Sequence, residues 1–186
     1  MKANVNNLGY IGSKPGSGDP GRDSDSWFTP KKYTKMVRDV LGRIDLDPFS
    51  SEFGNTYVEA EKYFTVEQDA FSTPWFEENI KGSVFMNPPY GRGIVNQAAD
   101  FFVDNVKKGY ITEGVVLVNN ATETKWFHTL LQESSSICLP SGRIAFENND
   151  GKNVSGNTRG QVFLYFGSER IKFAEVFKEI GVILDL

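Results

Sequence analysis

The stretch SVFMNPPY, residues 83–90, decides how the rest of this chain is organised. Its first four residues form an apolar run, which predicts the end of a buried strand. The next four are Asn87, Pro88, Pro89 and Tyr90. Two glycines follow within three residues and indicate a sharp turn. We therefore expect an amide, two rigid prolines and an aromatic ring to lie together at the tip of a strand.

Such a tip suits methyl transfer to an amino nitrogen whose lone pair is delocalised into a ring or a carbonyl group. The side-chain oxygen of Asn87 and the backbone carbonyl of Pro88 are acceptors for the two protons of that amino group, and together they draw the nitrogen toward tetrahedral geometry. Proline suits this position because its fixed φ holds the carbonyls and it has no N–H to compete. The Tyr90 ring can stack on a planar base pulled from its helix. The alternative is an ordinary strand-terminating turn, because an Asn-Pro pair is also a common loop signal.

Composition limits the other kinds of chemistry. With 186 residues, of which 39% are hydrophobic, the chain can bury one core of ordinary size. The single cysteine, Cys138, excludes an internal disulfide, and with one histidine, His128, a Cys- or His-based metal site is not expected. Cys138 is expected to be a small buried residue, and His128 an exposed or half-buried one. No apolar run approaches the roughly 20 residues of a membrane span, and no signal peptide is recognisable, so we expect a cytoplasmic protein.

The chain divides into a tail and one domain. Residues 1–26 are rich in Gly, Ser, Asn and Asp, and they cannot bury enough apolar surface to offset the entropy of ordering. We expect a flexible tail there and a single domain over residues 27–186. The sequence Phe28, Thr29, Pro30 predicts a helix start, with Thr29 as N-cap and Pro30 as the first helical residue. The aromatic pair at residues 27–28 can either pack on the sheet or contact a ligand.

Hydrophobic periodicity predicts alternating helices and strands beyond that point. A first helix is expected to run to Gly42, and further helices are expected over residues 94–106, 122–131 and 170–180. Strands are expected over residues 43–47, 83–86, 114–118, 137–139, 161–166 and 182–184. The alternation predicts an α/β fold with a mostly parallel sheet flanked by helices.

Two acidic residues are candidates for contacts with a cofactor. Asp47, followed by Pro48, ends the first strand, and ligands of open α/β sheets lie at the carboxyl ends of strands. An equally good alternative is that Asp47 caps a helix. Asp69 lies two residues before Phe71, and an acid beside an aromatic ring can read an adenine, although a solvated turn acid is the commoner case.

Several stretches together resemble the small phage-type DNA N6-adenine methyltransferase family. The resemblance covers about residues 27–167 and rests on residues 27–30, 46–48, 63–69, the tetrad with Gly91, residues 122–128, and Gly142, Arg143 and Phe146. It implies a Rossmann-like methyltransferase fold that uses S-adenosylmethionine and no metal. By the same resemblance, Phe28, Thr29 and Pro30 lie against the methionine part of the cofactor, Asp47 and Pro48 open its pocket, and Asp69 contacts its adenine. Asn87, Pro88, Pro89 and Tyr90 would hold the target adenine, flipped out of the duplex. The ribose contact stays unassigned, with Glu59 and Glu61 as candidates.

The expected partner is DNA, bound by a protein assumed to be monomeric. Basic residues around the predicted strand-end face are candidates for phosphate contacts, which position a protein without specifying sequence. They are Arg92, Lys125, Arg143, Lys152 and Arg159. The polar stretch 147–160 is expected to be a loop that embraces DNA. Methylation of RNA or of a protein glutamine, and DNA binding without turnover, are the alternative functions.

Overall fold

The structure, a computed structural model, describes residues 28–77, 80–90, 93–148, 150–153 and 157–186. The predicted flexible tail over residues 1–26 and the predicted roles of Trp27, Gly91 and Arg92 lie outside the described residues.

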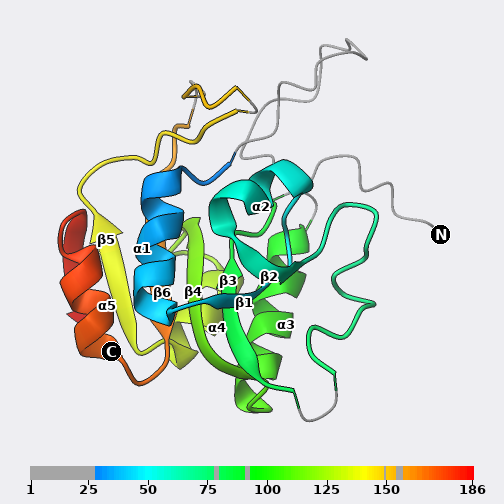
Figure 1. The fold of residues 1–186 in the computed structure, drawn as a ribbon. Helices are drawn as coiled ribbons and strands as arrows, with labels where there is room; N and C mark the ends of the chain where they lie inside the picture. Colours follow the sequence, from blue (N-terminus) through cyan, green and yellow to red (C-terminus); the bar gives the residue numbers. More distant parts are fainter. Residues whose placement is uncertain (1–27, 78–79, 91–92, 149, 154–156) are drawn as a thin grey trace.

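A seven-stranded sheet forms the centre of the fold (Figure 1). The strands are β1 (Ile44–Asp47), β2 (Ala60–Tyr63), β3 (Gly82–Met86), β4 (Ile111–Asn119), β5 (Ser136–Pro140), β6 (Gln161–Phe166) and β7 (Gly181–Asp185). They are hydrogen-bonded in the order β2-β1-β3-β4-β6-β5-β7. Every residue of β3 is buried, which confirms the buried strand predicted to lead to the tip.

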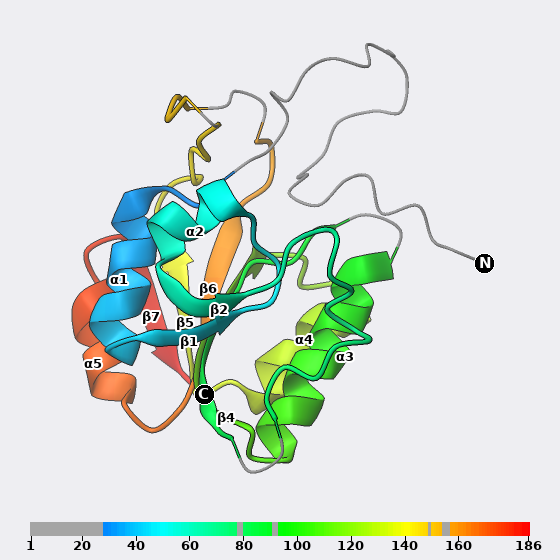
Figure 2. The same ribbon diagram turned by 45° about the vertical axis from the view of Figure 1, so that its right-hand side comes forward.

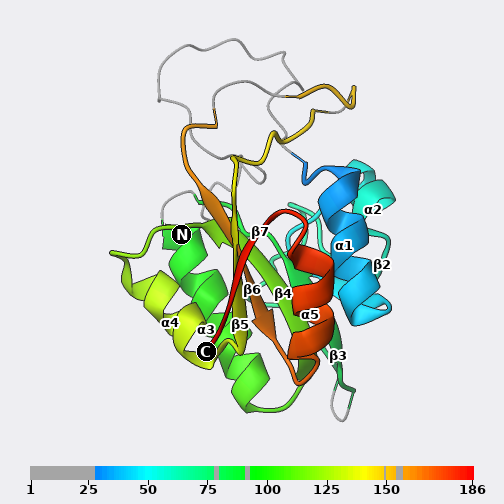
Figure 3. The ribbon, with the colours of Figure 1, turned by 90° about the vertical axis from the view of Figure 1, so that its left-hand side faces the viewer.

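Helices cover both faces of the sheet (Figure 3). One face carries α1 (Lys31–Leu41), α2 (Glu52–Val58) and α5 (Arg170–Phe177). The other face carries α3 (Ile94–Lys107) and α4 (Lys125–Glu133). Two hydrophobic clusters result, one beneath α3 and α4 that includes Phe102 and Leu130, and one beneath α1 and α5 that includes Val37 and Phe173.

The sheet is mixed, so the prediction of a mostly parallel sheet is not confirmed. The pairs β1–β2, β1–β3 and β3–β4 are parallel, whereas β4–β6, β5–β6 and β5–β7 are antiparallel. The sequence misleads here because all six residues of β6 are buried. A continuous apolar run is the usual pattern of a central parallel strand, and it contains no signal for strand direction.

The predicted helices are found, with shifts at their ends. α1 ends at Leu41, and the predicted end residue, Gly42, is its C-cap, where a φ of 77° suits glycine. Its start was predicted one residue too early, because Pro30 is the N-cap and Thr29 precedes the helix. α4 begins at Lys125 and not at residue 122, since the preceding residues form a turn in which Thr124 N donates to Ala121 O (3.0 Å).

Helix α2 was not predicted. It is only seven residues long and contains Gly54, a residue that disfavours helix. Its first turn is held by Ser51, whose Oγ accepts a hydrogen bond from Gly54 N (2.9 Å). A Cβ at this position would lie 3.1 Å from Ser51 Oγ and 3.2 Å from the Phe28 ring, so a larger residue would require a neighbour to shift by a few tenths of an ångström. Close packing therefore favours glycine here against its low helix propensity.

Cys138 is fully buried in β5, as predicted, and burial raises the pKa of its thiol to about 12. In the part of the chain that the structure describes, none of the helices is long and apolar enough to cross a membrane.

Candidate active site

Polar side chains that end different strands meet at one edge of the sheet. β1, β3 and β4 are parallel, so Asp47, Asn87 and Asn119 lie at their shared carboxyl end. Figure 2 shows the sheet between α1, α2 and α5 on one side and α3 and α4 on the other. β6 runs in the opposite direction, and its first residue, Gln161, pairs with Asn119 at the same edge. The predicted strand-end site is therefore assembled from four strands that are far apart in the sequence.

Asn87 is held in one orientation by Thr29. Its amide nitrogen, Nδ2, donates a hydrogen bond to Thr29 Oγ1 at 3.1 Å. Because the nitrogen is occupied, the side-chain oxygen of Asn87 is directed to the other side of the carboxamide. Pro88 and Pro89 are buried behind it, whereas Asn87 itself is partly exposed. The tip is thus a partly exposed carboxamide that directly precedes two buried prolines.

The Tyr90 ring is fixed by two contacts from the neighbouring strand and helix. Its hydroxyl oxygen accepts a hydrogen bond from the backbone N–H of Asn119 at 2.5 Å. Its ring packs edge-on against Trp126, with 6.1 Å between centroids. Burial raises the pKa of the Tyr90 phenol, while the bond from Asn119 and the charge of Arg159 lower it by less. The phenol therefore stays neutral, and the ring is a preformed wall at the tip.

The segment that precedes α1 lies against the tip. Phe28 pairs with Glu147 through two backbone hydrogen bonds of 2.7 and 3.0 Å, and its ring packs on Phe53 at 4.8 Å. Thr29 and Pro30, which follow it, are buried. The tertiary structure thus brings the predicted residues 28–30 together with the tetrad, although 58 positions separate Thr29 from Asn87.

Asp47 is a buried carboxyl group. Only 4% of its surface is exposed, and its Oδ1 accepts a hydrogen bond from Phe49 N at 3.1 Å. Burial raises its pKa from 3.8 to about 6, against the lowering effects of the bonds from Phe49 and Ser50. Asp47 does not cap a helix, since Ser51 caps α2, so that alternative was wrong. Pro48 follows it and is buried as well.

Asp69 is exposed, and its carboxylate bonds within its own turn. Its two oxygens accept from Phe71 N (2.9 Å) and Ser72 Oγ (2.6 Å). The bonds from Ser72 and Phe71 lower the pKa of Asp69, so it is ionised at neutral pH. The contacts of Asp69 are therefore those of a solvated turn acid, the alternative to adenine binding. The Phe71 ring packs against Phe49 at 5.7 Å, which places the turn beside the segment that follows β1.

The two ribose candidates differ in position. Glu59 lies just before β2, at the amino end of that strand and opposite the candidate site, and it pairs with Arg38 at 3.2 Å. Glu61 is exposed one residue into β2. The sheet therefore does not bring Glu59 to the tip.

Exposed basic side chains flank the site. Lys125 begins α4, directly before Trp126. The backbone carbonyl of Arg159 accepts a hydrogen bond from Gln161, which pairs with Asn119 at the same edge of the sheet, and the charge of Arg159 lowers the pKa of Tyr90. Arg143 and Lys152 are exposed in the long connection between β5 and β6. This connection is not wholly irregular, because Glu147 bridges to Asn153 as well as to Phe28.

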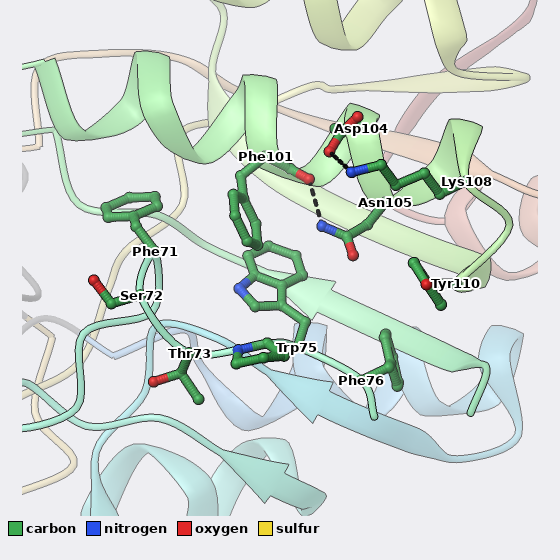
Figure 4. Close-up of a pocket in the computed structure, with 11 residues that line it drawn as sticks. Phe71, Ser72, Thr73, Trp75, Phe76, Phe101, Asp104, Asn105, Lys108 and Tyr110 are labelled. Atoms are coloured by element: carbon green, nitrogen blue, oxygen red, sulfur yellow. Dashed lines mark hydrogen bonds and ion pairs between the residues drawn. The ribbon is translucent and has the colours of Figure 1, made fainter. Parts of the chain in front are cut away.

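A cavity of about 300 Å³ lies away from the tip, between α3 and residues 71–76 (Figure 4). Its lining includes Trp75, Phe101 and Tyr110, with the Asp104–Lys108 ion pair (2.6 Å) at its edge. No residue of the tetrad lines it. Among the described residues, no group of three or more His, Cys, Asp or Glu side chains is placed to hold a metal ion.

Sequence reasoning missed the buried amides beside the tip. Asn119 and Gln161 are 2% and 4% exposed, and Gln161 Nε2 donates to Asn119 Oδ1 at 3.1 Å. In the sequence, Asn119 and Gln161 are each only an amide residue at one end of an apolar run, which is a weak indication of a site. They are brought together by the antiparallel pairing of β4 with β6.

A sequence model of the family described as DNA N-6-adenine-methyltransferase (Dam) matches residues 16–179. The chain belongs to the DNA N-6-adenine-methyltransferase (Dam) family. This confirms the family suggested by the resemblance. The Dam match runs through all the strands from β1 to β6 and includes the tip, Thr29 and Asp47. No curated protein matches the chain.

Proposed function

We propose that this Dam-family protein is a site-specific enzyme that methylates the exocyclic N6 amine of adenine in DNA, with S-adenosylmethionine as methyl donor. The observation that carries the proposal is the Asn87 carboxamide, whose nitrogen is tied to Thr29 so that its oxygen is presented at a strand tip. Family membership supports adenine in DNA as the acceptor. The α/β sheet with helices on both faces is compatible with a Rossmann-like methyltransferase fold.

The target amine is proposed to be gripped by two oxygens. Asn87 Oδ1 and the Pro88 carbonyl accept its two protons, so the nitrogen lone pair is turned away from the ring. The Tyr90 face stacks on the adenine, and Trp126 and Asn119 keep that face in place. An adenine inside a duplex cannot reach such a tip, so the base is proposed to flip out of the stack.

The chemistry of the donor set fits the proposed cofactor. S-adenosylmethionine supplies a methyl group on a positively charged sulfur, which needs no strong base for transfer. Asp47 offers a buried carboxyl group with hydrogen-bond donors and no cation among its described contacts, so it suits a positively charged ligand group nearby. Thr29 adds a hydroxyl group, and Phe28 an apolar surface. We assign residues 28–30 and 47–48 to the cofactor, together with Asp69 and the Phe71 ring for its adenine.

DNA is proposed to lie across the carboxyl edge of the sheet, where the exposed Lys125, Arg143 and Arg159 face its phosphates. Residues 27–186 are proposed to form one catalytic domain that recognises a short or loosely defined target sequence. As a phage-type enzyme it would act in the cytoplasm of the host cell, as a monomer.

The test is incubation of the protein with S-adenosylmethionine and unmethylated DNA, followed by digestion and mass spectrometry of the nucleosides. N6-methyladenine is expected with the unmutated protein and not with Asn87→Ala, while cofactor affinity changes little. Gln132→Ala is the matched control, because Gln132 is an exposed carboxamide at the far end of α4. Near-normal turnover of Asn87→Ala would refute the role of the tip. Methylation of RNA or of a protein glutamine instead of DNA would replace the proposed acceptor.

A further inference from the structure

Two side-chain amides clamp the backbone of Arg159. Asn157 Oδ1 accepts a hydrogen bond from Arg159 N at 3.2 Å, and Gln161 Nε2 donates one to Arg159 O at 2.9 Å. The backbone N–H and C=O of Arg159 are thus both hydrogen-bonded to side chains and not to a neighbouring helix or strand. The position of Arg159 is therefore defined even though it lies in a connection between strands.

The clamp is anchored in the sheet. Gln161 is the first residue of β6, and its Oε1 accepts from Ile144 N (3.3 Å) and from Asn157 Nδ2 (3.0 Å). Asn157 Nδ2 also donates to Ile144 O at 2.9 Å. Buried amides are stable only when their donors and acceptors are paired, and this network pairs them with backbone from two segments.

The same network reaches the tip. Gln161 Nε2 also donates to Asn119 Oδ1, and the backbone N–H of Asn119 holds the Tyr90 hydroxyl. Arg159 and the Tyr90 ring are therefore linked through two paired residues, Gln161 and Asn119. This link couples the position of the Arg159 backbone to that of the aromatic ring.

The Arg159 side chain itself is exposed, and no ion pair to it is found among the described residues. Its charge is felt at Tyr90, where it lowers the pKa of the phenol against the larger effect of burial. The clamped backbone therefore carries, near the tip, a guanidinium that has no ion pair among the described residues and is available to an anion. Guanidinium groups match phosphate oxygens through two parallel hydrogen bonds.

We propose that Arg159 binds the DNA phosphate next to the adenine held at the tip, and that Asn157 and Gln161 are positioning residues for that contact. This inference rests on the proposed function. A base that leaves the duplex rotates about its own backbone, so a fixed charge on the neighbouring phosphate holds the flipped nucleotide in register with Tyr90. Preorganisation lowers the entropy that binding would otherwise cost.

The first experiment measures DNA affinity over a series of salt concentrations. One phosphate contact contributes about 0.9 to the slope of log affinity against log salt on duplex DNA. Arg159→Ala is expected to reduce the slope by about that amount and to raise the KM for DNA about tenfold, with unchanged affinity for S-adenosylmethionine. Arg170→Ala is the matched control, because Arg170 is an exposed arginine beyond the opposite end of β6 and should change neither quantity.

The second experiment separates positioning from general stability. Gln161→Met removes the amide at similar volume, and it is expected to weaken DNA binding about fivefold in the unmutated background and less than twofold in the Arg159→Ala background. Loss of the same size in both backgrounds would mean a merely structural role and would overturn the positioning assignment. Asn157→Ala provides the same comparison from a half-buried position if Gln161→Met lowers folding yield.

The two experiments distinguish failure of the Arg159 contact from failure of the proposed function. If the unmutated protein methylates adenine but Arg159→Ala keeps the salt slope and KM, the phosphate contact is wrong and the proposed function stands. If the protein binds DNA with the expected loss in Arg159→Ala but no methyladenine forms, the proposed function is wrong and the clamp stands. If the unmutated protein binds no DNA, both are wrong.

Discussion

Substitution of Asp47 by asparagine should stabilise the free protein and impair cofactor binding. The carboxyl group is almost fully buried, and burial raises its pKa to about 6. At neutral pH it is nevertheless mostly ionised, so the folded protein carries a buried charge that water would solvate better. An asparagine of the same shape keeps an oxygen that can accept from Phe49 N and removes the charge.

The size of the effect follows from the two pKa values. A change from 3.8 to about 6 corresponds to about 3 kcal/mol, since a tenfold change in proton affinity is worth about 1.4 kcal/mol. The folded state binds more protons than the unfolded state in that interval, so the unfolding free energy falls as pH rises from about 4 to 6. Asp47→Asn should lack this fall. At pH 7.5 we expect its unfolding free energy to exceed that of the unmutated protein by about 1 to 3 kcal/mol.

The assay combines urea unfolding at pH 5 and pH 7.5 with calorimetric titration of S-adenosylmethionine. A cationic ligand favours the ionised carboxyl, so cofactor affinity of the unmutated protein should fall as pH drops below about 6. Asp47→Asn should bind the cofactor at least about tenfold more weakly at pH 7.5, with no such pH dependence. Asp45→Asn is the control from the same strand. The Asp45 carboxylate pairs with Arg43 (2.7 Å) and accepts from Ser83 N (2.7 Å), so its loss should destabilise the protein.

Two outcomes would refute this reasoning. If Asp47→Asn destabilises the protein at pH 7.5, the buried charge is compensated and the unfavourable ionisation is wrong. If the variant is more stable but binds S-adenosylmethionine normally, the buried charge of Asp47 destabilises the fold but does not contribute to cofactor binding.

Two further predictions concern the tip. Thr29→Val removes the hydroxyl that holds Asn87 Nδ2, so kcat should fall about tenfold. Thr29→Ser keeps the hydroxyl and should retain most of the kcat of the unmutated protein. An unchanged kcat of Thr29→Val in steady-state assays would show that the bond does not orient the amide. Tyr90→Phe keeps the stacking ring but leaves the Asn119 N–H without its acceptor, at a cost of about 1 to 3 kcal/mol in urea unfolding. Its KM for DNA should change less than twofold, and a large rise in KM with normal stability would contradict the assignment of the ring as the base contact.

The strand-end tip and most of the secondary structure could be predicted because their signals are local. An apolar run before Asn87 indicates a buried strand, and the apolar stripe over residues 94–106 indicates the helix that became α3. The order of short motifs was enough to suggest the family. These features depend on residues that are close in the sequence, so they can be predicted from short segments of it.

Local signals failed where packing outweighed them. Helix α2 contains Gly54, whose small size lets the first turn approach Phe28, and its apolar residues are too few to establish a helical period in the sequence. The direction of β6 could not be predicted from the sequence either, because a strand that is buried along its whole length can pack in either direction. That direction matters, since it puts Gln161 at the carboxyl edge of β4.

Local motifs are enough to specify which chemical groups the candidate site contains, namely an amide, two prolines, an aromatic ring and acids at strand ends. The orientation of those groups depends on the packing of the whole chain. The bond from Asn87 to Thr29 and the link from Tyr90 through Asn119 to Gln161 join segments separated by 58, 29 and 42 residues. Such contacts arise from sheet order and strand direction, which depend on how the whole chain packs and not on any single stretch of it.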